Sequence, residues 1–218
     1  MSRQGLRSGH AERIERIGFY IDGFNFYHGL RAKGWARYRW LDYRALIDRF
    51  VRDGQRVELA KYFTTRVTDV ESRQRQDRYL QALGVRGGLD LIEGKFEMRS
   101  KQCGECGKWF KRPQEKYTDV NIATHLLLDA LDDQVDTVAV ITADSDLLPA
   151  LTAVTARFAR RFVLIDPPRR HSDELAKLAD AHLHVPENWL RQCQLPDPVE
   201  YLNRKSKVRH VYKPDGWR

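Results

Sequence analysis

The sequence predicts an α/β fold in which helices lie on both sides of a largely parallel β-sheet. Short apolar runs rich in β-branched residues alternate with amphipathic segments along most of the 218 residues. Strands that read as continuous apolar runs and alternate with helices are typical of parallel sheets covered on both faces. A chain of this length is sufficient for one such domain with its own core, plus short appendages.

The first half of the chain contains three predicted strands and two predicted helices. Leu46, Ile47 and Phe50 recur at helical spacing, and Gly84 follows the charged segment expected to form the second helix. The strands are predicted at Ile17–Asp22, Arg56–Val67 and Leu89–Met98, and the helices at Asp42–Val51 and Glu71–Leu83.

The second half continues the alternation. Pro149 falls in the first turn of a predicted helix, where proline is tolerated, and Ser172 can cap another helix. The helices are predicted at Glu115–Leu131, Asp146–Phe158, Ser172–Asp180 and Pro186–Cys193, and the strands at Thr137–Thr142, Arg161–Ile165 and His182–Val185.

These elements divide the chain into a domain and two tails. We assign residues 1–16 to an N-terminal tail, 17–195 to the domain and 196–218 to a basic C-terminal tail. Residues 99–114 form a basic, cysteine-containing insertion within the domain. We expect the C-terminal tail to be loosely ordered or to dock on another surface.

The charge distribution favours a polyanionic partner. The net charge is +8 and the pI about 9.5, and each phosphate contact made by a cation releases condensed counterions. Residues 99–116 carry six Lys or Arg against two Glu, and residues 204–218 carry six against one Asp. Tyr201, Tyr212 and Trp217 lie in or near the second cluster, and such aromatic rings suit unstacked nucleobases. The alternative is that both stretches are solvated surface.

Composition argues against a membrane protein and a secreted disulfide scaffold. The longest apolar run, Val138 to Ala143, spans about six residues, whereas a membrane-spanning helix needs roughly 20. The first 16 residues lack the apolar stretch of a secretory signal. Three cysteines are an odd, small number that favours a reducing environment. We therefore expect a cytoplasmic protein with no membrane span.

Acidic residues follow two of the predicted strands. Asp22 ends the first strand, with Asn25 three residues later, and Asp144 and Asp146 follow the strand that ends at Thr142. Ligands in open parallel sheets bind beyond the carboxyl ends of the strands. Two carboxylates so close together repel one another, and a divalent cation would relieve the repulsion. The alternative is that these side chains only cap the helices that follow.

Asp119 adds a third acidic position. It begins a stripe on the predicted helix Glu115–Leu131 that continues through Ile122, Ala123, Leu126, Leu127 and Ala130, so we expect it to face the sheet. A carboxylate turned inward is costly unless it is paired or binds a metal. It could instead pair with Lys116 or an arginine. Together with the strand-end acids, Asp119 could help to hold one or two Mg²⁺ or Mn²⁺ ions that activate a water.

Three segments, in this order and spacing, resemble the NYN domains, and in particular their bacterial LabA-like branch. They are 20–25 (YIDGFN), 115–120 (EKYTDV) and 141–149 (ITADSDLLP), and the later stretches 172–175 (SDEL) and 178–180 (LAD) are also similar. The resemblance covers about residues 17 to 195 and implies a PIN-like (Rossmann-like) fold with a metal-dependent ribonuclease site. By motif, Asp22, Asp119, Asp144 and Asp146 take the metal-ligand positions, and Asn25 and Thr142 the polar positions beside them. Ala143 departs from the family pattern, which often has Gly there.

A C-x-x-C pair lies in the basic insertion. Cys103 and Cys106 resemble half of a zinc ribbon, which needs four ligands. Cys193 and a histidine, from among His125, His171, His182 and His184, could complete the site, or two chains could share one zinc. The alternative is a knuckle without metal. The spacing of the seven histidines indicates no other ligand set.

The same insertion is expected to lie near the mouth of the acidic site and to grip RNA. Charge reversal of Lys108, Lys111 and Arg112 should then weaken RNA binding. The candidate RNA-binding residues are Arg99, Lys101, Lys108, Trp109, Lys111 and Arg112.

Three functions follow from these patterns. The complete acid set favours a metal-dependent endoribonuclease, since binding alone does not require it. The second hypothesis is an RNA-binding module without catalysis, which would bind in a salt-sensitive way. The third is a 6-hydroxy-3-succinoylpyridine hydroxylase, as some LabA-like proteins are described, but the sequence has no flavin or dinucleotide fingerprint. The resemblance also allows a homodimer, although no residue demonstrates one.

Overall fold

Six parallel strands form the centre of the computed structural model, which describes residues 13–217 apart from the side chains of residues 111–115. Their spatial order is β3-β2-β1-β6-β7-β8, and all five neighbouring pairs run parallel. The predicted fold class is therefore confirmed. The strands are β1 Glu15–Asp22, β2 Gln55–Thr64, β3 Asp90–Glu93, β6 Thr137–Ile141, β7 Arg161–Asp166 and β8 Ala181–His184.

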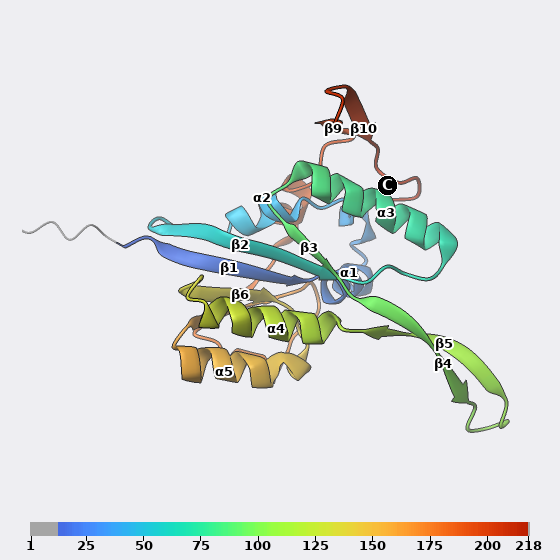
Figure 1. Cartoon of the computed structure of the whole chain (residues 1–218), viewed down its shortest axis with the longest axis horizontal. Helices are drawn as coiled ribbons and strands as arrows, with labels where there is room; N and C mark the ends of the chain where they lie inside the picture. The colour runs from blue at the N-terminus through green and yellow to red at the C-terminus, as the bar shows by residue number, and fades with distance from the viewer. Residues whose placement is uncertain (1–12, 218) are drawn as a thin grey trace, which may run out of the picture.

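Helices cover both faces of this sheet (Figure 1). The helices α2 and α3 lie on one side of β1 and β2, and α4 and α5 lie together on the other. The helices are α1 Gly23–Ala32, α2 Tyr43–Asp48, α3 Val70–Arg86, α4 Thr118–Leu131, α5 Leu148–Phe158, α6 Asp173–Leu178 and α7 Glu187–Gln192, with 3₁₀ turns at Ala36–Tyr38 and Ser145–Leu147.

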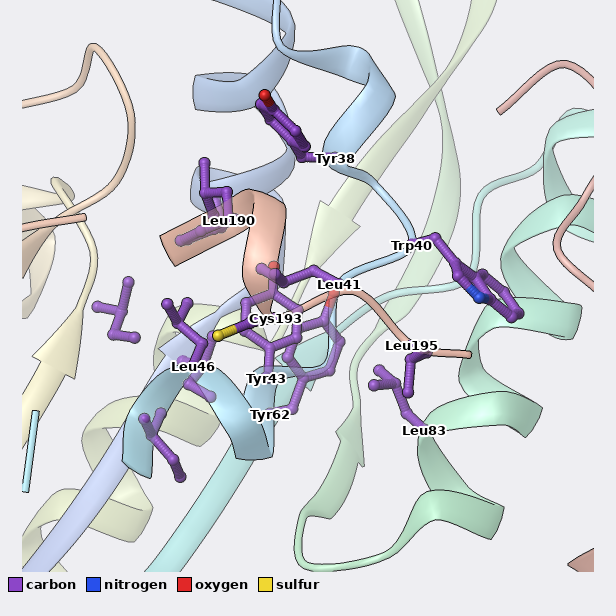
Figure 2. Close-up of a cluster of buried hydrophobic side chains, with 14 of the residues drawn as sticks. Tyr38, Trp40, Leu41, Tyr43, Leu46, Tyr62, Leu83, Leu190, Cys193 and Leu195 are labelled. Atoms are coloured by element: carbon purple, nitrogen blue, oxygen red, sulfur yellow. The ribbon is translucent and has the colours of Figure 1, made fainter. Parts of the chain in front are cut away.

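Alternation along the central strands separates two hydrophobic cores. Phe19 and Ile21 of β1 face the core under α1, α2, α3 and α7, whereas Tyr20 faces the core under α4, α5 and α6. This follows from the period of two along a strand. Figure 2 shows part of the first core, where Cys193 lies among Tyr43, Leu46 and other buried side chains.

Residues 95–116 form an antiparallel hairpin that the sequence did not predict. Its strands are β4 Lys95–Gln102 and β5 Trp109–Lys116, and it projects from the body of the molecule (Figure 1). The predicted strand Leu89–Met98 is divided at Gly94, where a Cβ would lie only 2.5 Å from the hydroxyl of Thr65. Tyr117, with a φ of 78°, separates β5 from α4. The predicted helix over Glu115–Leu131 therefore begins at Thr118.

Two further differences concern helices. The segment Gly23–Ala32 forms α1, which the sequence patterns did not predict. The helix α3 continues through Gly84 to Arg86.

The C-terminal residues dock on the domain. The strands β9 Val199–Leu202 and β10 Val208–Val211 form an antiparallel hairpin beside α3. Trp217 is 7% exposed, and its ring lies 5.4 Å from that of Tyr79 and 6.3 Å from that of Trp40. We expected the C-terminal tail to be either loosely ordered or docked on another surface. In the structure it is docked on the domain. No helix in the described part of the chain is both long and apolar enough to cross a membrane.

Candidate active site

The strand-end acids meet because β1 and β6 are parallel neighbours. Ile21 pairs with Ile141, so the residues that follow, Asp22 and Thr142, leave the sheet at the same edge. Gly23 permits the sharp exit into α1, since a Cβ there would approach the Tyr62 ring to 2.5 Å. The topology thus positions Asp22 beside the loop that carries Asp144 and Asp146.

Asp22 is held by neutral hydrogen-bond donors. Its side chain is at the N-cap of α1, and one oxygen accepts from the backbone N–H of Asn25 at 2.9 Å. The other oxygen accepts from Asn25 Nδ2 at 2.6 Å and from Thr142 Oγ1 at 3.0 Å. The cap expected from sequence is therefore present, and it also orients the carboxylate.

Thr142 connects Asp22 to Asp144. Its hydroxyl accepts from the backbone N–H of Asp144 at 3.1 Å, and Asp144 Oδ1 in turn accepts from the N–H of Asp146 at 3.0 Å. Thr142 is fully buried, Asp144 is half-buried and Asp146 is exposed. The exposure of the carboxylates therefore increases across the site, from the buried Asp22 through Asp144 to Asp146. Ala143 lies outside the positive-φ region, so the departure from Gly requires no backbone strain.

The hydrogen bonds that Asp22 accepts from side chains in the described part of the chain come from neutral groups. Burial raises the pKa of Asp22, the bonds from Asn25 and Thr142 oppose this, and the nearby Asp144 carboxylate raises it further. Within the described residues, Asp22, Asp144 and Asp146 form no ion pair with Lys or Arg. A buried carboxylate beside a second acid favours either a proton or a bound cation.

Asp119 does not face the sheet, which corrects the expectation from the helical stripe. It is exposed in the first turn of α4, and this turn lies at the carboxyl edge, where Thr118 Oγ1 is 3.0 Å from Thr65 Oγ1. The inward carboxylate of this helix is Asp129, which pairs with Lys61 of β2. Asp119 therefore lies in an exposed turn near the carboxyl edge of the sheet.

Arg170 is a site residue that sequence reasoning missed. It lies in the loop after β7, and its Nη1 donates to Asn25 Oδ1 at 2.6 Å. The bond orients the Asn25 amide so that its Nδ2 faces Asp22. Only the pairing of β7 beside β6 brings this loop to α1, and the sequence signal was limited to two consecutive arginines after two prolines.

A cavity of about 380 Å³ opens beside this edge, between α1, α3 and the base of the β4–β5 hairpin. Gly23 and His28 line it, so it begins directly next to Asp22. Arginines 31, 39 and 75 outnumber the one acidic lining residue, Asp69, so the charged side chains of the walls are mainly positive. Its aromatic lining consists of Phe24, Tyr27, Tyr43, Tyr62, Tyr79, Phe96 and Trp217. Such a cavity suits a flat, electron-rich ring that carries negative charge.

The base of the β4–β5 hairpin reaches the site, but its cysteine tip does not. Phe96 packs edge-on against Phe24 of α1 with ring centroids 6.2 Å apart, whereas the tip projects away from the body (Figure 1). The expectation that the cysteine pair lies near the acidic mouth is thus corrected. Arg99, Lys101, Lys108 and Trp109 are exposed along the hairpin. The side chains of Lys111 and Arg112 lie outside the described residues.

Cys193 is not placed to complete a zinc site with Cys103 and Cys106. It is buried in the core under α7 (Figure 2), where burial raises the pKa of its thiol. In the hairpin, hydrogen bonds from Glu105 and Cys106 lower the pKa of Cys103. A zinc shared between two chains stays a prediction.

One group of potential metal ligands in the described residues gathers more tightly than the acids. Asp166, His171 and His182 each offer an atom, and these atoms all lie within 4.8 Å of one another. The four predicted acids form no such group of three in this part of the chain. The two histidines were not assigned together from sequence, because they share no spacing and meet only through the pairing of β7 with β8.

Comparisons with known proteins agree with this architecture. The family model for the NYN domain matches residues 16–187. The chain is 29% identical to the 6-hydroxy-3-succinoylpyridine 3-monooxygenase HspA of Pseudomonas putida, over 93% of this chain and 75% of that protein. A crystal structure of a protein of unknown function from Vibrio parahaemolyticus superposes with a TM-score of 0.58 at 21% identity, covering 82% of this chain and 97% of that one.

Proposed function

The chain belongs to the NYN domain family, and from that premise we propose that it is a Mg²⁺- or Mn²⁺-dependent endoribonuclease that hydrolyses RNA phosphodiester bonds. The observation that carries the proposal is the buried Asp22 beside Asp144 at the carboxyl edge of a parallel sheet, where no Lys or Arg among the described residues pairs with it. Buried charges in proteins are generally paired with an opposite charge or coordinate a metal ion.

The donor set fits a hard divalent cation. Mg²⁺ prefers oxygen ligands, keeps several waters and uses only one or two protein carboxylates together with substrate phosphates. Asp22 and Asp144 supply the inner carboxylates, and Asp119 and Asp146 lie at the solvent side of the same edge. When bound, the cation would activate a water and balance negative charge on the phosphate.

The protein's own residues hold the site in shape and receive the RNA. Asn25 and Thr142 orient Asp22, and Arg170 fixes Asn25 while presenting positive charge beside the site. A base next to the scissile phosphate would stack in the aromatic cavity that begins at Gly23. The exposed cations of the β4–β5 hairpin would hold more distant phosphates.

Cleavage of labelled RNA tests this proposal. Purified protein should cut RNA with Mg²⁺ or Mn²⁺ and not with EDTA, and Asp22→Asn or Asp144→Asn should abolish cutting. Asp132→Asn, which alters an exposed acid after α4, is the matched control and should retain activity. Cleavage by the site variants at the rate of the control would contradict the proposal, and metal-independent RNA binding without cutting would favour the binding-module hypothesis.

The hairpin's role is tested separately by binding. Arg99→Glu combined with Lys101→Glu and Lys108→Glu should weaken RNA binding and lower the salt dependence by about one unit of slope for each phosphate that the hairpin no longer binds. Arg204→Glu combined with Lys205→Glu and Lys207→Glu reverses the same number of charges on the exposed β9–β10 connection. Equal effects of both sets on RNA affinity would assign the effect to net charge, not to the hairpin.

A second candidate function is hydroxylation of a small aromatic acid. The relative from Pseudomonas putida is named a monooxygenase of a pyridine compound, and the aromatic, arginine-lined cavity suits such a molecule. This hypothesis predicts oxygen-dependent consumption of NADH or a flavin requirement in the presence of a hydroxypyridine acid. The LabA-like branch, a cytoplasmic location and a homodimer also stay predictions.

A further inference from the structure

A cluster separate from the acidic site lies at the ends of β7 and β8. Asp166 is the last residue of β7, His182 lies in β8 and His171 follows in the loop between β7 and α6. In the sheet order β1-β6-β7-β8, the cluster is displaced from Asp22 toward the opposite edge strand. The proposed nuclease site does not use these residues.

Both imidazoles converge on one carboxylate oxygen. His171 Nδ1 and His182 Nε2 each lie 2.8 Å from Asp166 Oδ2. The two imidazole rings stack on one another, with centroids 5.1 Å apart.

Two features distinguish the cluster from an ordinary surface ion pair. Asp166 Oδ1 is buried and has no hydrogen-bond partner in the described part of the chain, which leaves a lone-pair acceptor unsatisfied. In addition, His171 Nε2 lies 3.0 Å from Asp173 Oδ1. A metal-binding histidine usually donates its second N–H to a carboxylate in this way, which directs the other nitrogen toward the metal.

We propose that Asp166, His171 and His182 form a binding site for one divalent transition-metal ion. Two imidazoles and one carboxylate suit Fe²⁺, Co²⁺, Ni²⁺ or Zn²⁺ better than Mg²⁺, which prefers oxygen ligands alone. Three protein ligands on one side leave coordination positions open, and the exposure of both histidines leaves those positions accessible to water or a small ligand. This is the donor set found in non-haem Fe²⁺ sites.

Metal binding here would also affect the acidic edge. Arg170, which bonds to Asn25, immediately precedes His171 in the same loop. Fixing His171 on a metal would therefore restrict the loop that presents Arg170 to the first site. The two sites remain chemically distinct, since one offers hard oxygens and the other imidazoles.

Cobalt binding to the full chain tests this inference. After treatment with a chelator, the protein is titrated with Co²⁺ alone and followed by visible absorption and calorimetry. We expect one Co²⁺ per chain, a loss of affinity of more than about 100-fold in His171→Ala and His182→Ala, and a loss of about 10-fold in Asp173→Asn. His184→Ala, an exposed histidine of the same strand, should bind as the wild type does.

Two further variants separate this site from the others. Cys103→Ser with Cys106→Ser, and Asp22→Asn with Asp144→Asn, should both retain the Co²⁺ signal. Unchanged affinity in His171→Ala and His182→Ala, or loss of the signal only in the cysteine or acid variants, would overturn the inference. Thermal melts report folding of each variant, and a Co²⁺-dependent rise in Tm confined to proteins with both histidines would support it. Because RNA cleavage is not measured, failure here leaves the nuclease proposal intact.

Discussion

Two buried aspartates in this fold, Asp22 and Asp129, differ in how their charge is balanced. They are 2% and 5% exposed, respectively. Asp129 accepts from Lys61 Nζ at 2.6 and 2.8 Å and from the Tyr20 hydroxyl at 2.8 Å. Among the residues that the structure describes, Asp22 accepts hydrogen bonds only from the neutral groups of Asn25 and Thr142. The negative charge of Asp129 is balanced by Lys61 within the protein. The charge of Asp22 is left for a proton or an external cation to balance.

The difference also concerns position. Asp129 lies between α4 and the middle of the sheet, where Lys61 and His125 enclose it. Asp22 lies at the carboxyl edge, next to an open cavity and to the half-buried Asp144. Equal burial of two carboxylates therefore does not indicate an equal role. The presence or absence of a cationic side chain separates a structural acid from a candidate ligand.

The largest expected effect is a loss of stability when the pair between Lys61 and Asp129 is broken. Lys61→Met leaves Asp129 buried without its cation and should lower the free energy of unfolding by about 3–5 kcal/mol. Lys61→Met combined with Asp129→Leu and Tyr20→Phe should recover most of that free energy, because no uncompensated polar group is left. Urea unfolding measures both. A single variant as stable as the wild type would show that Asp129 does not depend on Lys61.

A smaller effect is expected at Asp22, in the pH dependence of stability. Its pKa is raised in the folded state, so its contribution is fully present below the ordinary aspartate pKa and is lost as pH rises through the raised value. The wild type should therefore lose stability relative to Asp22→Asn over that window, and Mg²⁺ should reduce the loss because it favours the charged form.

Urea unfolding of the two proteins, in pH steps from about 4 upward, with and without Mg²⁺, gives this difference. Acids that do not interact with Asp22 cancel in the comparison, whereas Asp144 is coupled to it. If the stability difference between the two proteins does not vary with pH, the inference that Asp22 carries an unbalanced charge is wrong.

The smallest expected stability effect is at the link between the acids. Thr142→Val removes the hydroxyl that donates to Asp22 and accepts from the N–H of Asp144, and should cost about 1–3 kcal/mol. It should also slow RNA cleavage, since Asp22 loses an orienting bond. Thr152→Val, on the exposed face of α5, removes only a bond to Leu148 O and is the control. Equal effects at both threonines would argue against a positioning role for Thr142.

Much of the fold could be predicted because it depends on local patterns. The continuous apolar run of β6 is fully buried, as such runs are in parallel sheets. The strand ends at Asp22 and Thr142 could be brought together on topology alone, since parallel neighbours end at the same edge. The β4–β5 hairpin could not be predicted from the sequence, because its residues are mostly polar and the break at Gly94 depends on its close approach to Thr65.

The sequence by itself determined the alternation of strands and helices and the acids at two strand ends, because periodicity and strand exits are local properties of the chain. Only the tertiary structure decided which carboxylate of α4 is buried, since Asp119 is exposed in the first turn while Asp129 pairs with Lys61. It also decided that Asp166, His171 and His182 meet. Partners from separate strands and loops are chosen by packing in three dimensions, and no spacing along the chain encodes that choice.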